Sequence, residues 1–170
     1  MASFGLGRAA AAASSSSTTP APQTLIDSST PWMAASEGNL ALLQSSLQSL
    51  QLPVTAADEN GYTLLHAAAS YNQMPVLHFL LSHPEVVANV NAADKDGDTA
   101  LHYAGEVAAA RLLVETAHVN RSLVNAQGKT ALQAKQEELE EMLQDEDVED
   151  DDDDLEALKA VVQYLSSLTN

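Results

Sequence analysis

Two histidines stand in equivalent places near a threonine, and they are the first candidates for chemistry in this chain. His66 lies three residues after Thr63, and His102 lies three residues after Thr99. A histidine in such a setting could serve in catalysis or ligate a metal ion. Either role needs a second partner at a suitable spacing, and none adjoins these residues in the sequence. The two pairs by themselves therefore predict neither an active site nor a metal site.

The other motifs that resemble ligand sites lack the spacing that their chemistry requires. His78 and His83 lie five residues apart, which is not the spacing of the His-Glu-x-x-His zinc motif. The run 94–98 resembles a calcium loop, but such a loop needs glycine at its sixth position and glutamate at its twelfth. Here glycine is fourth, and Gly105 stands at the twelfth position. The run 5–10 resembles part of a dinucleotide fingerprint, but it follows no expected strand.

Several further catalytic signatures are missing from the sequence. The chain contains no cysteine, no Gly-x-Ser-x-Gly elbow and no phosphate-binding loop. Thiolate nucleophiles, disulfides and cysteine zinc sites are thereby excluded. We therefore expect no enzyme activity, no metal site and no cofactor.

Composition favours closely packed helices and argues against several kinds of partner. Hydrophobic residues make up 45% of the 170 residues but aromatic residues only 4%, so alanine and leucine supply most of the apolar surface. The net charge of −17 disfavours binding to nucleic acid and to anionic membrane surfaces. No apolar run approaches the roughly 18 residues of a membrane helix. More than half of the 24 acidic residues lie between Glu137 and Glu156, so the charge is concentrated in one segment.

A repeated frame organises the chain. The pattern Gly-x-Thr-x-Leu-His occurs at Gly61–His66 and Gly97–His102, and in weaker form at Gly128–Gln133, where glutamine replaces histidine. The glycines recur at close to the roughly 33-residue period of ankyrin repeats, whose signature is Thr-Pro-Leu-His-x-Ala. The chain therefore resembles the ankyrin-repeat family.

The resemblance implies a fold and a role for the histidines. The expected fold is an all-α ankyrin-repeat solenoid of helix-turn-helix units joined by β-hairpin-like turns. In this family the repeated histidine is structural, and its ring bonds across the hairpin turn to the backbone and to the threonine. We therefore expect His66 and His102 to hold the fold together.

The domain organisation follows from the frame. Residues 1–28 are rich in alanine and serine and have no apolar period, which predicts a disordered tail. Residues 29–170 form the expected repeat domain. Thr30 is the expected cap of the first helix, with Pro31 in its first turn. The repeats are expected at about 30–57, 58–93, 94–124 and 125–170.

The frame breaks in the third and fourth repeats. The third is four residues shorter than the second between its histidine and the leucines of its second helix. This predicts a short first helix, a tight bend at Gly105 and a second helix from about Glu106. The fourth contains an acidic insertion, 144–154. After it, apolar residues recur at helical spacing from Leu155 to Leu168, which predicts an amphipathic second helix. Acidic residues just before that helix are expected to stabilise its N-terminus.

The family resemblance also implies a binding surface. In ankyrin-repeat proteins the hairpin tips and first helices form a concave face that binds a partner protein. Tyr62, Tyr71 and Tyr103 are the expected anchors on this face, because tyrosine offers apolar area and a hydroxyl. Carried over by motif position, the predicted partner-binding residues are Glu59, Asn60, Tyr62, Ser70, Tyr71, Lys95, Asp96, Asp98, Tyr103, Gln127 and Lys129.

Two functions remain open at this point. The first is a non-enzymatic protein–protein interaction module, acting as an adaptor, inhibitor or assembly factor through the concave face. The alternative is an acidic chaperone-like binder of basic proteins through the run 144–154, although that run also reads as a solvated, self-repelling loop. The residues of this acidic strip are Asp145, Glu146, Asp147, Glu149, Asp150, Asp151, Asp152, Asp153 and Asp154.

The expected partner is another protein, with a basic surface in the alternative reading. We expect no nucleic-acid or membrane partner and a monomeric chain. The short array with its insertion also resembles small ankyrin-repeat proteins of fungi, which implies a location in the cytoplasm or the nucleus.

Overall fold

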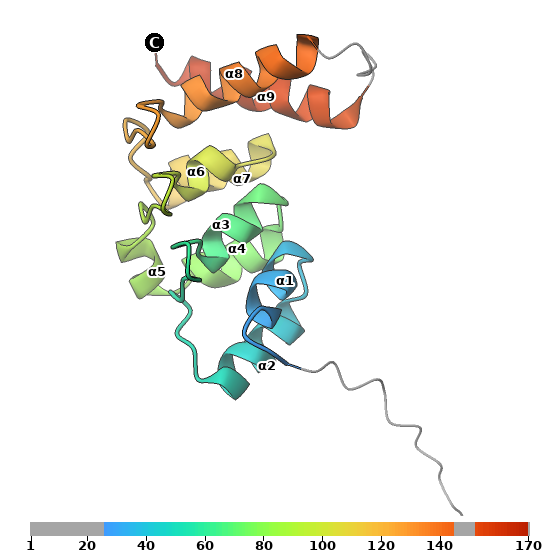
Figure 1. Cartoon of the computed structure of the whole chain (residues 1–170), viewed down its shortest axis with the longest axis vertical. Helices are drawn as coiled ribbons and strands as arrows, with labels where there is room; N and C mark the ends of the chain where they lie inside the picture. Colours follow the sequence, from blue (N-terminus) through green and yellow to red (C-terminus); the bar gives the residue numbers. More distant parts are fainter. Residues whose placement is uncertain (1–25, 145–151, 170) are drawn as a thin grey trace, which may run out of the picture.

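The computed structural model describes residues 26–144 and 152–169. Its helices pack as successive pairs, which stack from α1 and α2 at the bottom of Figure 1 to α8 and α9 at the top. The elements in chain order are α1 (Thr30–Ser36), α2 (Leu40–Leu50), α3 (Leu64–Ser70), α4 (Met74–Leu81), α5 (Pro84–Ala88), α6 (Ala100–Tyr103), α7 (Val107–Arg111), the π-helical turn η1 (Leu112–Thr116), α8 (Ala131–Gln144) and α9 (Asp153–Ser167).

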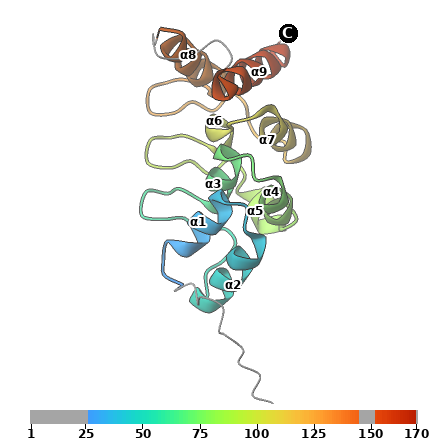
Figure 2. The same ribbon diagram turned by 90° about the vertical axis from the view of Figure 1, so that its right-hand side faces the viewer.

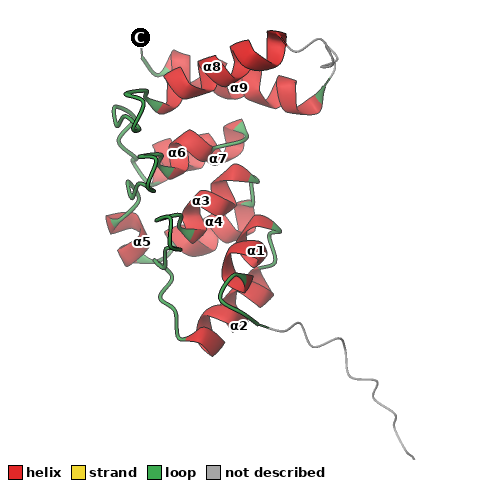
Figure 3. Ribbon diagram, viewed as in Figure 1, coloured by secondary structure: helices red, strands yellow, loops and turns green. Residues whose placement is uncertain are grey.

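The helices form two layers, and three hairpins project from one side of them. Helices α1, α3, α6 and α8 contact one another in sequence, while α4 and α9 flank α7 in the second layer. Figure 2 shows the hairpins stacked on the left, beside the first layer, and the second layer on the right. The described residues contain helices and loops but no strand (Figure 3), and each hairpin is closed by one isolated antiparallel bridge. The bridges join Ala57 to Thr63, Ala93 to Thr99 and Val124 to Thr130.

The core consists mainly of alanine and leucine. Ala68, Ala69 and Ala104 in the first layer are fully buried, as are Leu77 and Leu80 in the second. Alanine side chains let neighbouring helices approach closely, and leucines from the second layer fill the space between the pairs. Each pair thus buries its apolar faces against its neighbours, as in other repeat architectures.

One local pattern builds all three hairpins. In the second hairpin, the Asp94 carboxylate accepts the backbone N–H groups of Asp96 and Asp98, both at 3.0 Å. Asp58 and Asn125 make the corresponding pair of bonds in their own hairpins. Gly97 adopts a φ of +79°, and a Cβ there would lie 2.8 Å from the backbone nitrogen of Ala126. Only glycine satisfies both the turn and the close approach of the next hairpin.

The start of the first helix differs from the prediction. Thr30 is the first residue of α1 and not its cap. Asp27, which falls within the predicted tail, accepts hydrogen bonds from the backbone N–H groups of Ser29 and Thr30 at 2.9 and 3.0 Å. A carboxylate is a stronger acceptor than a hydroxyl, so it takes the amides at the helix N-terminus. Residues 1–25 of the predicted tail lie outside the described residues.

The third repeat has the predicted short first helix and bend. Helix α6 has four residues and α7 begins at Val107, directly after Glu106. Gly105 permits the bend because its backbone passes close to the C-terminal end of α3, where its N–H donates to the Ala69 oxygen at 3.2 Å. A Cβ on Gly105 would lie 2.4 Å from the backbone oxygen of Ser70, which leaves no room for a side chain.

Two features between the predicted helices were missed. Helix α4 ends at Leu81, before His83-Pro84, and Pro84 opens the short helix α5, which was not predicted. Proline suits the first turn of a helix, and burial of Val86 holds α5 in place. Helix α8 runs to Gln144, and Asp152 caps α9. The ends of the predicted insertion 144–154 are therefore helical, and residues 145–151 lie outside the described part of the chain.

Candidate partner-binding surface

Three ring nitrogens join each repeat to the hairpin of the next. The Trp32 Nε1–H donates to the Tyr62 backbone oxygen at 2.8 Å. His66 Nε2 lies 3.1 Å from the Asp98 oxygen, and His102 Nε2 lies 3.2 Å from the Lys129 oxygen. In each case the acceptor is the residue just before the hairpin threonine. These bonds hold the hairpins in register along the stack.

Each histidine also bonds within its own repeat. His66 Nδ1 accepts the backbone N–H of Thr63 at 3.0 Å, and His102 Nδ1 accepts that of Thr99 at 3.2 Å. Because Nδ1 is an acceptor, the proton of the neutral ring is on Nε2 and points at the next hairpin. Burial lowers the pKa of His66, which favours this neutral form. The expected structural role of both histidines is confirmed.

Gln133 reproduces the contact that each histidine makes within its own repeat. Its Oε1 accepts the backbone N–H of Thr130 at 2.9 Å, as His66 Nδ1 does for Thr63. The side chain of Gln133 is exposed, whereas the rings of His66 and His102 are buried. The substitution therefore preserves the local cap of α8.

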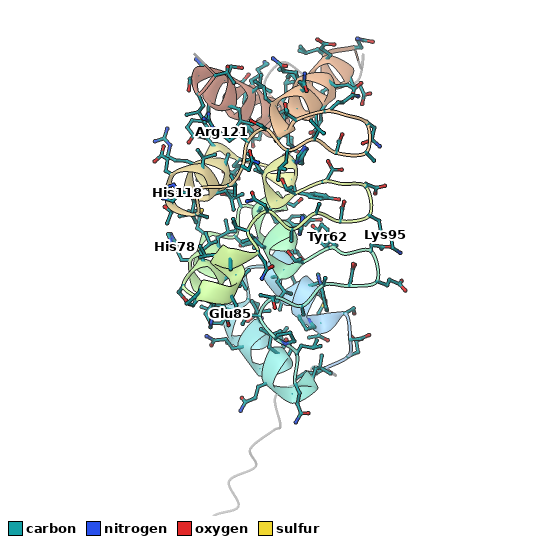
Figure 4. The ribbon with its side chains drawn as sticks, turned by 90° about the vertical axis from the view of Figure 1, so that its left-hand side faces the viewer. Tyr62, His78, Glu85, Lys95, His118 and Arg121 are labelled. Atoms are coloured by element: carbon teal, nitrogen blue, oxygen red, sulfur yellow. The ribbon has the colours of Figure 1, made fainter. Side chains whose placement is uncertain are left out.

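The predicted residues at the hairpin tips form a row of exposed side chains. We call Glu59, Asn60, Lys95, Asp96 and Gln127 the tip surface, and all five are exposed. Adjacent tips are joined through their backbones: the Lys95 N–H donates to the Asn60 oxygen at 2.8 Å, and the Ala126 N–H donates to the Asp96 oxygen at 2.7 Å. Backbone pairing leaves the side chains pointing outward, and Figure 4 shows Lys95 at the end of its hairpin.

The three predicted tyrosine anchors are not equivalent. Tyr71, at the end of α3, is 63% exposed. Tyr62 and Tyr103 are half-buried, and their rings pack edge to face with centroids 5.1 Å apart. The Tyr103 hydroxyl donates to Asp94 Oδ2 at 2.7 Å. Burial, followed by the charges of neighbouring groups, raises the pKa of Tyr62 to about 12. Tyr62 and Tyr103 therefore stabilise the contact between repeats, and of the three predicted anchors only Tyr71 has an exposed side chain.

The remaining predicted residues are partly engaged. Asp98 Oδ1 accepts a hydrogen bond from Asn125 Nδ2 at 2.9 Å, and Lys129 forms an ion pair with Glu137. Ser70 is half-buried at the end of α3, beside Tyr71. Their contribution to partner binding stays a prediction.

A hollow that was not predicted from the sequence lies beside the bend at Gly105, just after the short helix α6. It has a volume of about 500 Å³ and is continuous in its lining with a neighbouring hollow of about 340 Å³, because both share Ser70, Lys135 and Glu138. We call the larger hollow the notch. Its lining residues are Ser70, Tyr71, Gly105, Glu106, Lys135, Glu138, Met142, Asp153, Asp154, Ala157 and Leu158.

The notch follows from unequal helix lengths. Helix α6 has four residues, whereas α8 has 14 and α9 has 15. The α8–α9 pair therefore reaches further than the α6–α7 pair below it (Figure 1). The end of α3 faces this overhang across the bend at Gly105. The signal in the sequence was the shortening of the third repeat by four residues. Which side chains surround the notch, however, depends on how the repeats stack.

The polar groups of the notch are mostly carboxylates. Lys135 is buried as a whole residue, and its Nζ donates to Glu138 Oε2 at 2.8 Å. Glu106 Oε2 accepts a hydrogen bond from Asn72 Nδ2 at 2.8 Å. Asp153 and Asp154 stand in the first turn of α9. The described lining of the notch therefore carries four carboxylates and one ammonium group, which pairs with Glu138.

The acidic strip is only partly placed by the structure. Asp152 Oδ1 accepts the N–H groups of Asp154 and Leu155 at 2.9 and 3.3 Å and so caps α9. The negative charges of Asp153 and Asp154 interact favourably with the positive N-terminal end of the α9 helix dipole. The six other predicted members lie outside the described residues: Asp145, Glu146, Asp147, Glu149, Asp150 and Asp151.

The described residues contain neither a metal-binding cluster nor a helix suited to span a membrane. No group of three or more histidine, aspartate or glutamate side chains within 26–144 and 152–169 is arranged to hold a metal ion. In the same ranges, none of the helices combines the length and apolar character needed to cross a bilayer.

Comparison with known proteins identifies the class to which this stack of helix pairs and hairpins belongs. A family model described as ankyrin repeats in three copies matches residues 31–123. The chain belongs to the ankyrin-repeat family. The match and the helical stack confirm the predicted all-α repeat fold. Ankyrin repeats are generally non-enzymatic modules for protein–protein interaction.

The similar curated proteins are longer than this chain. An ankyrin repeat-containing protein of Schizosaccharomyces pombe is 35% identical over 102 residues, which are 60% of this chain and 47% of that protein. The palmitoyltransferase akr1 of the same organism is 42% identical over 65 residues, 38% of this chain and 10% of that enzyme. A probable serine/threonine-protein kinase of Dictyostelium discoideum is 39% identical over 56 residues, 33% of this chain and 6% of that protein. The chain thus spans less than half the length of each of these relatives.

Proposed function

We propose that this chain is a non-enzymatic interaction module that binds a partner protein through the tip surface and Tyr71. Its biological role would be that of an adaptor, an inhibitor or an assembly factor. The observation that supports this most directly is that the residues that join the repeats differ from those that are exposed on the surface. Trp32, His66 and His102 are occupied in joining repeats, while the tip side chains and Tyr71 are exposed beside them.

The character of the exposed surface fits protein recognition. Tyr71 offers a large apolar area with a hydroxyl at its end, and aromatic residues of this kind dominate binding energy at interfaces. The tip side chains carry both charge signs and two amides, which suits a polar rim around an anchor. Since the hairpins are joined through their backbones, little conformational entropy is lost when a partner binds them.

Affinity capture with matched surface variants tests this proposal. The test variant carries Tyr71→Ala, Lys95→Ala and Gln127→Ala, because Tyr62 and Tyr103 are too well packed to change safely. The control carries His78→Ala and Glu85→Ala, two exposed residues away from the tips. Figure 4 shows both of them on the side of the second-layer helices. Both variants should give the helical circular dichroism of the natural chain.

We expect the test variant to lose its captured partners and the control variant to keep them. Equal capture by both variants would show that the concave face is not the binding surface. A third variant replaces the six acidic residues within 145–151 by their amides. If this variant alone loses partners, and moderate salt also removes them from the natural chain, the chaperone-like alternative is correct. The expected location, cytoplasm or nucleus, stays a prediction.

A further inference from the structure

We propose that the notch receives an arginine side chain of the partner protein, an inference that rests on the proposed function. The hollow is bounded by three separate elements: the end of α3 at Tyr71, the bend at Gly105, and the overhanging pair α8 and α9. It adjoins the exposed ring of Tyr71, the anchor on the concave face. A segment that binds this face would therefore have the notch beside its principal contact.

The charges around the notch select a cation. Glu106, Glu138, Asp153 and Asp154 line it, and the one lysine among its described lining residues, Lys135, already pairs with Glu138. An anion would have to approach these carboxylates. It would also find two of the first amides of α9 occupied, because Asp152 Oδ1 accepts the N–H groups of Asp154 and Leu155. Charge complementarity thus favours a positively charged group.

The shape and the apolar part of the lining favour arginine over lysine. Met142, Ala157 and Leu158 form an apolar portion of the wall, along which a long aliphatic stem can lie. The exposed ring of Tyr71 offers a face on which a guanidinium can stack. A guanidinium can also donate two parallel hydrogen bonds to one carboxylate, which an ammonium cannot do.

Acceptor oxygens remain for these donors. Glu106 and Glu138 each use Oε2 for a contact inside the protein, with Asn72 and Lys135 respectively. Within the described residues, neither Oε1 accepts a hydrogen bond. Asp153 and Asp154 are both exposed, so their carboxylates are open to a partner. Existing contacts orient two of the acids, which reduces the cost of forming the site.

Nuclear magnetic resonance titration of the full chain with a short glycine-serine peptide that carries one central arginine tests the inference. Its reference peptides replace the arginine by citrulline, which is neutral and nearly isosteric, or by lysine. We expect the arginine peptide to shift the backbone resonances of Gly105, Glu106 and Asp154. The citrulline peptide should bind at least about tenfold more weakly, because it loses the charge-assisted hydrogen bonds. The lysine peptide should lie between them.

Two variants with equal loss of charge separate the notch from general attraction. Glu106→Gln with Asp154→Asn removes two carboxylates from the notch, and Glu59→Gln with Asp96→Asn removes two from the tip surface. We expect about a tenfold weaker complex with the arginine peptide for the notch pair and little change for the tip pair. Similar losses in both pairs, or shifts spread away from the notch, would overturn the inference. So would loss of binding in the variant with amides throughout 145–151, which would place the peptide on that run.

This experiment is independent of the capture test. If the peptide distinguishes neither arginine from citrulline nor the two variants, the arginine site is wrong. The proposed function still stands in that case, provided that the change at Tyr71 and the tips removes captured partners. If those changes leave capture unaffected, the proposed function fails whatever the peptide does.

Discussion

His66 Nε2 lies 3.1 Å from the backbone oxygen of Asp98, on the hairpin of the following repeat. The same ring accepts the N–H of Thr63 on its own hairpin through Nδ1. One buried imidazole therefore satisfies a donor in one repeat and an acceptor in the next. Stability in repeat proteins depends on such contacts between neighbours, so this ring is a sensitive point for perturbation.

Replacing His66 should separate the two contributions of the ring. We expect His66→Ala to destabilise the chain by about 2–4 kcal/mol, because it opens a cavity and leaves two buried backbone groups without partners. His66→Gln should cost less, since its amide oxygen can accept the Thr63 N–H as Gln133 does for Thr130. Urea unfolding measures both. Equal costs for the two variants would mean that the bond to the Thr63 amide contributes nothing.

Acidification should weaken the fold through His66. Burial lowers the pKa of His66 below its ordinary value of 6.5, so the unfolded chain binds this proton more readily than the folded chain. The stabilisation is complete above that ordinary value and declines as the pH falls below it. Urea midpoints at about pH 7.5 and about pH 5.5 check this. The drop should be smaller in His66→Gln, and an identical drop would show that other groups cause it.

Gly105 should tolerate no side chain. A Cβ at this position would lie 2.4 Å from the Ser70 backbone oxygen, so we expect Gly105→Ala to cost about 1–3 kcal/mol through displaced backbone. Gly128→Asn is the control, because a Cβ there meets nothing within 4 Å and asparagine tolerates positive φ. Thermal unfolding measures both. A smaller loss for Gly105→Ala than for the control would contradict the close approach of Gly105 to the end of α3.

Asp152 should stabilise α9 specifically. Its carboxylate accepts two amides at the start of this helix, so Asp152→Ala should cost about 1 kcal/mol. Glu140→Gln also removes one acidic charge, but from an exposed position within α8, and should change stability by less than about 0.5 kcal/mol. Urea unfolding gives the two costs, and amide exchange in the first turns of α9 locates the effect. Faster exchange in both variants would point to net charge and not to the cap.

Local patterns were enough to predict the units of the fold. The frame Gly97-x-Thr99-x-Leu101-His102 encodes a turn, a helix cap and a buried ring within six residues, and the interactions that it specifies are mostly between close neighbours. The short α6 and the bend at Gly105 followed from counting residues between repeats. The helix after the insertion followed from its apolar period. Such features are readable because their causes lie within a few residues of one another.

The stacking of the repeats decided the rest. Tyr62 and Tyr103 looked like equivalent anchors to Tyr71, but their rings meet across two repeats and are half-buried. Asp27 replaced Thr30 as the source of the first cap, and α5 formed because burial of Val86 stabilised it. The notch brings Tyr71, Glu106 and Asp154 to one hollow from three distant parts of the chain. Which side chains meet across such distances depends on the lengths and offsets of packed helices, and no local pattern carries that information.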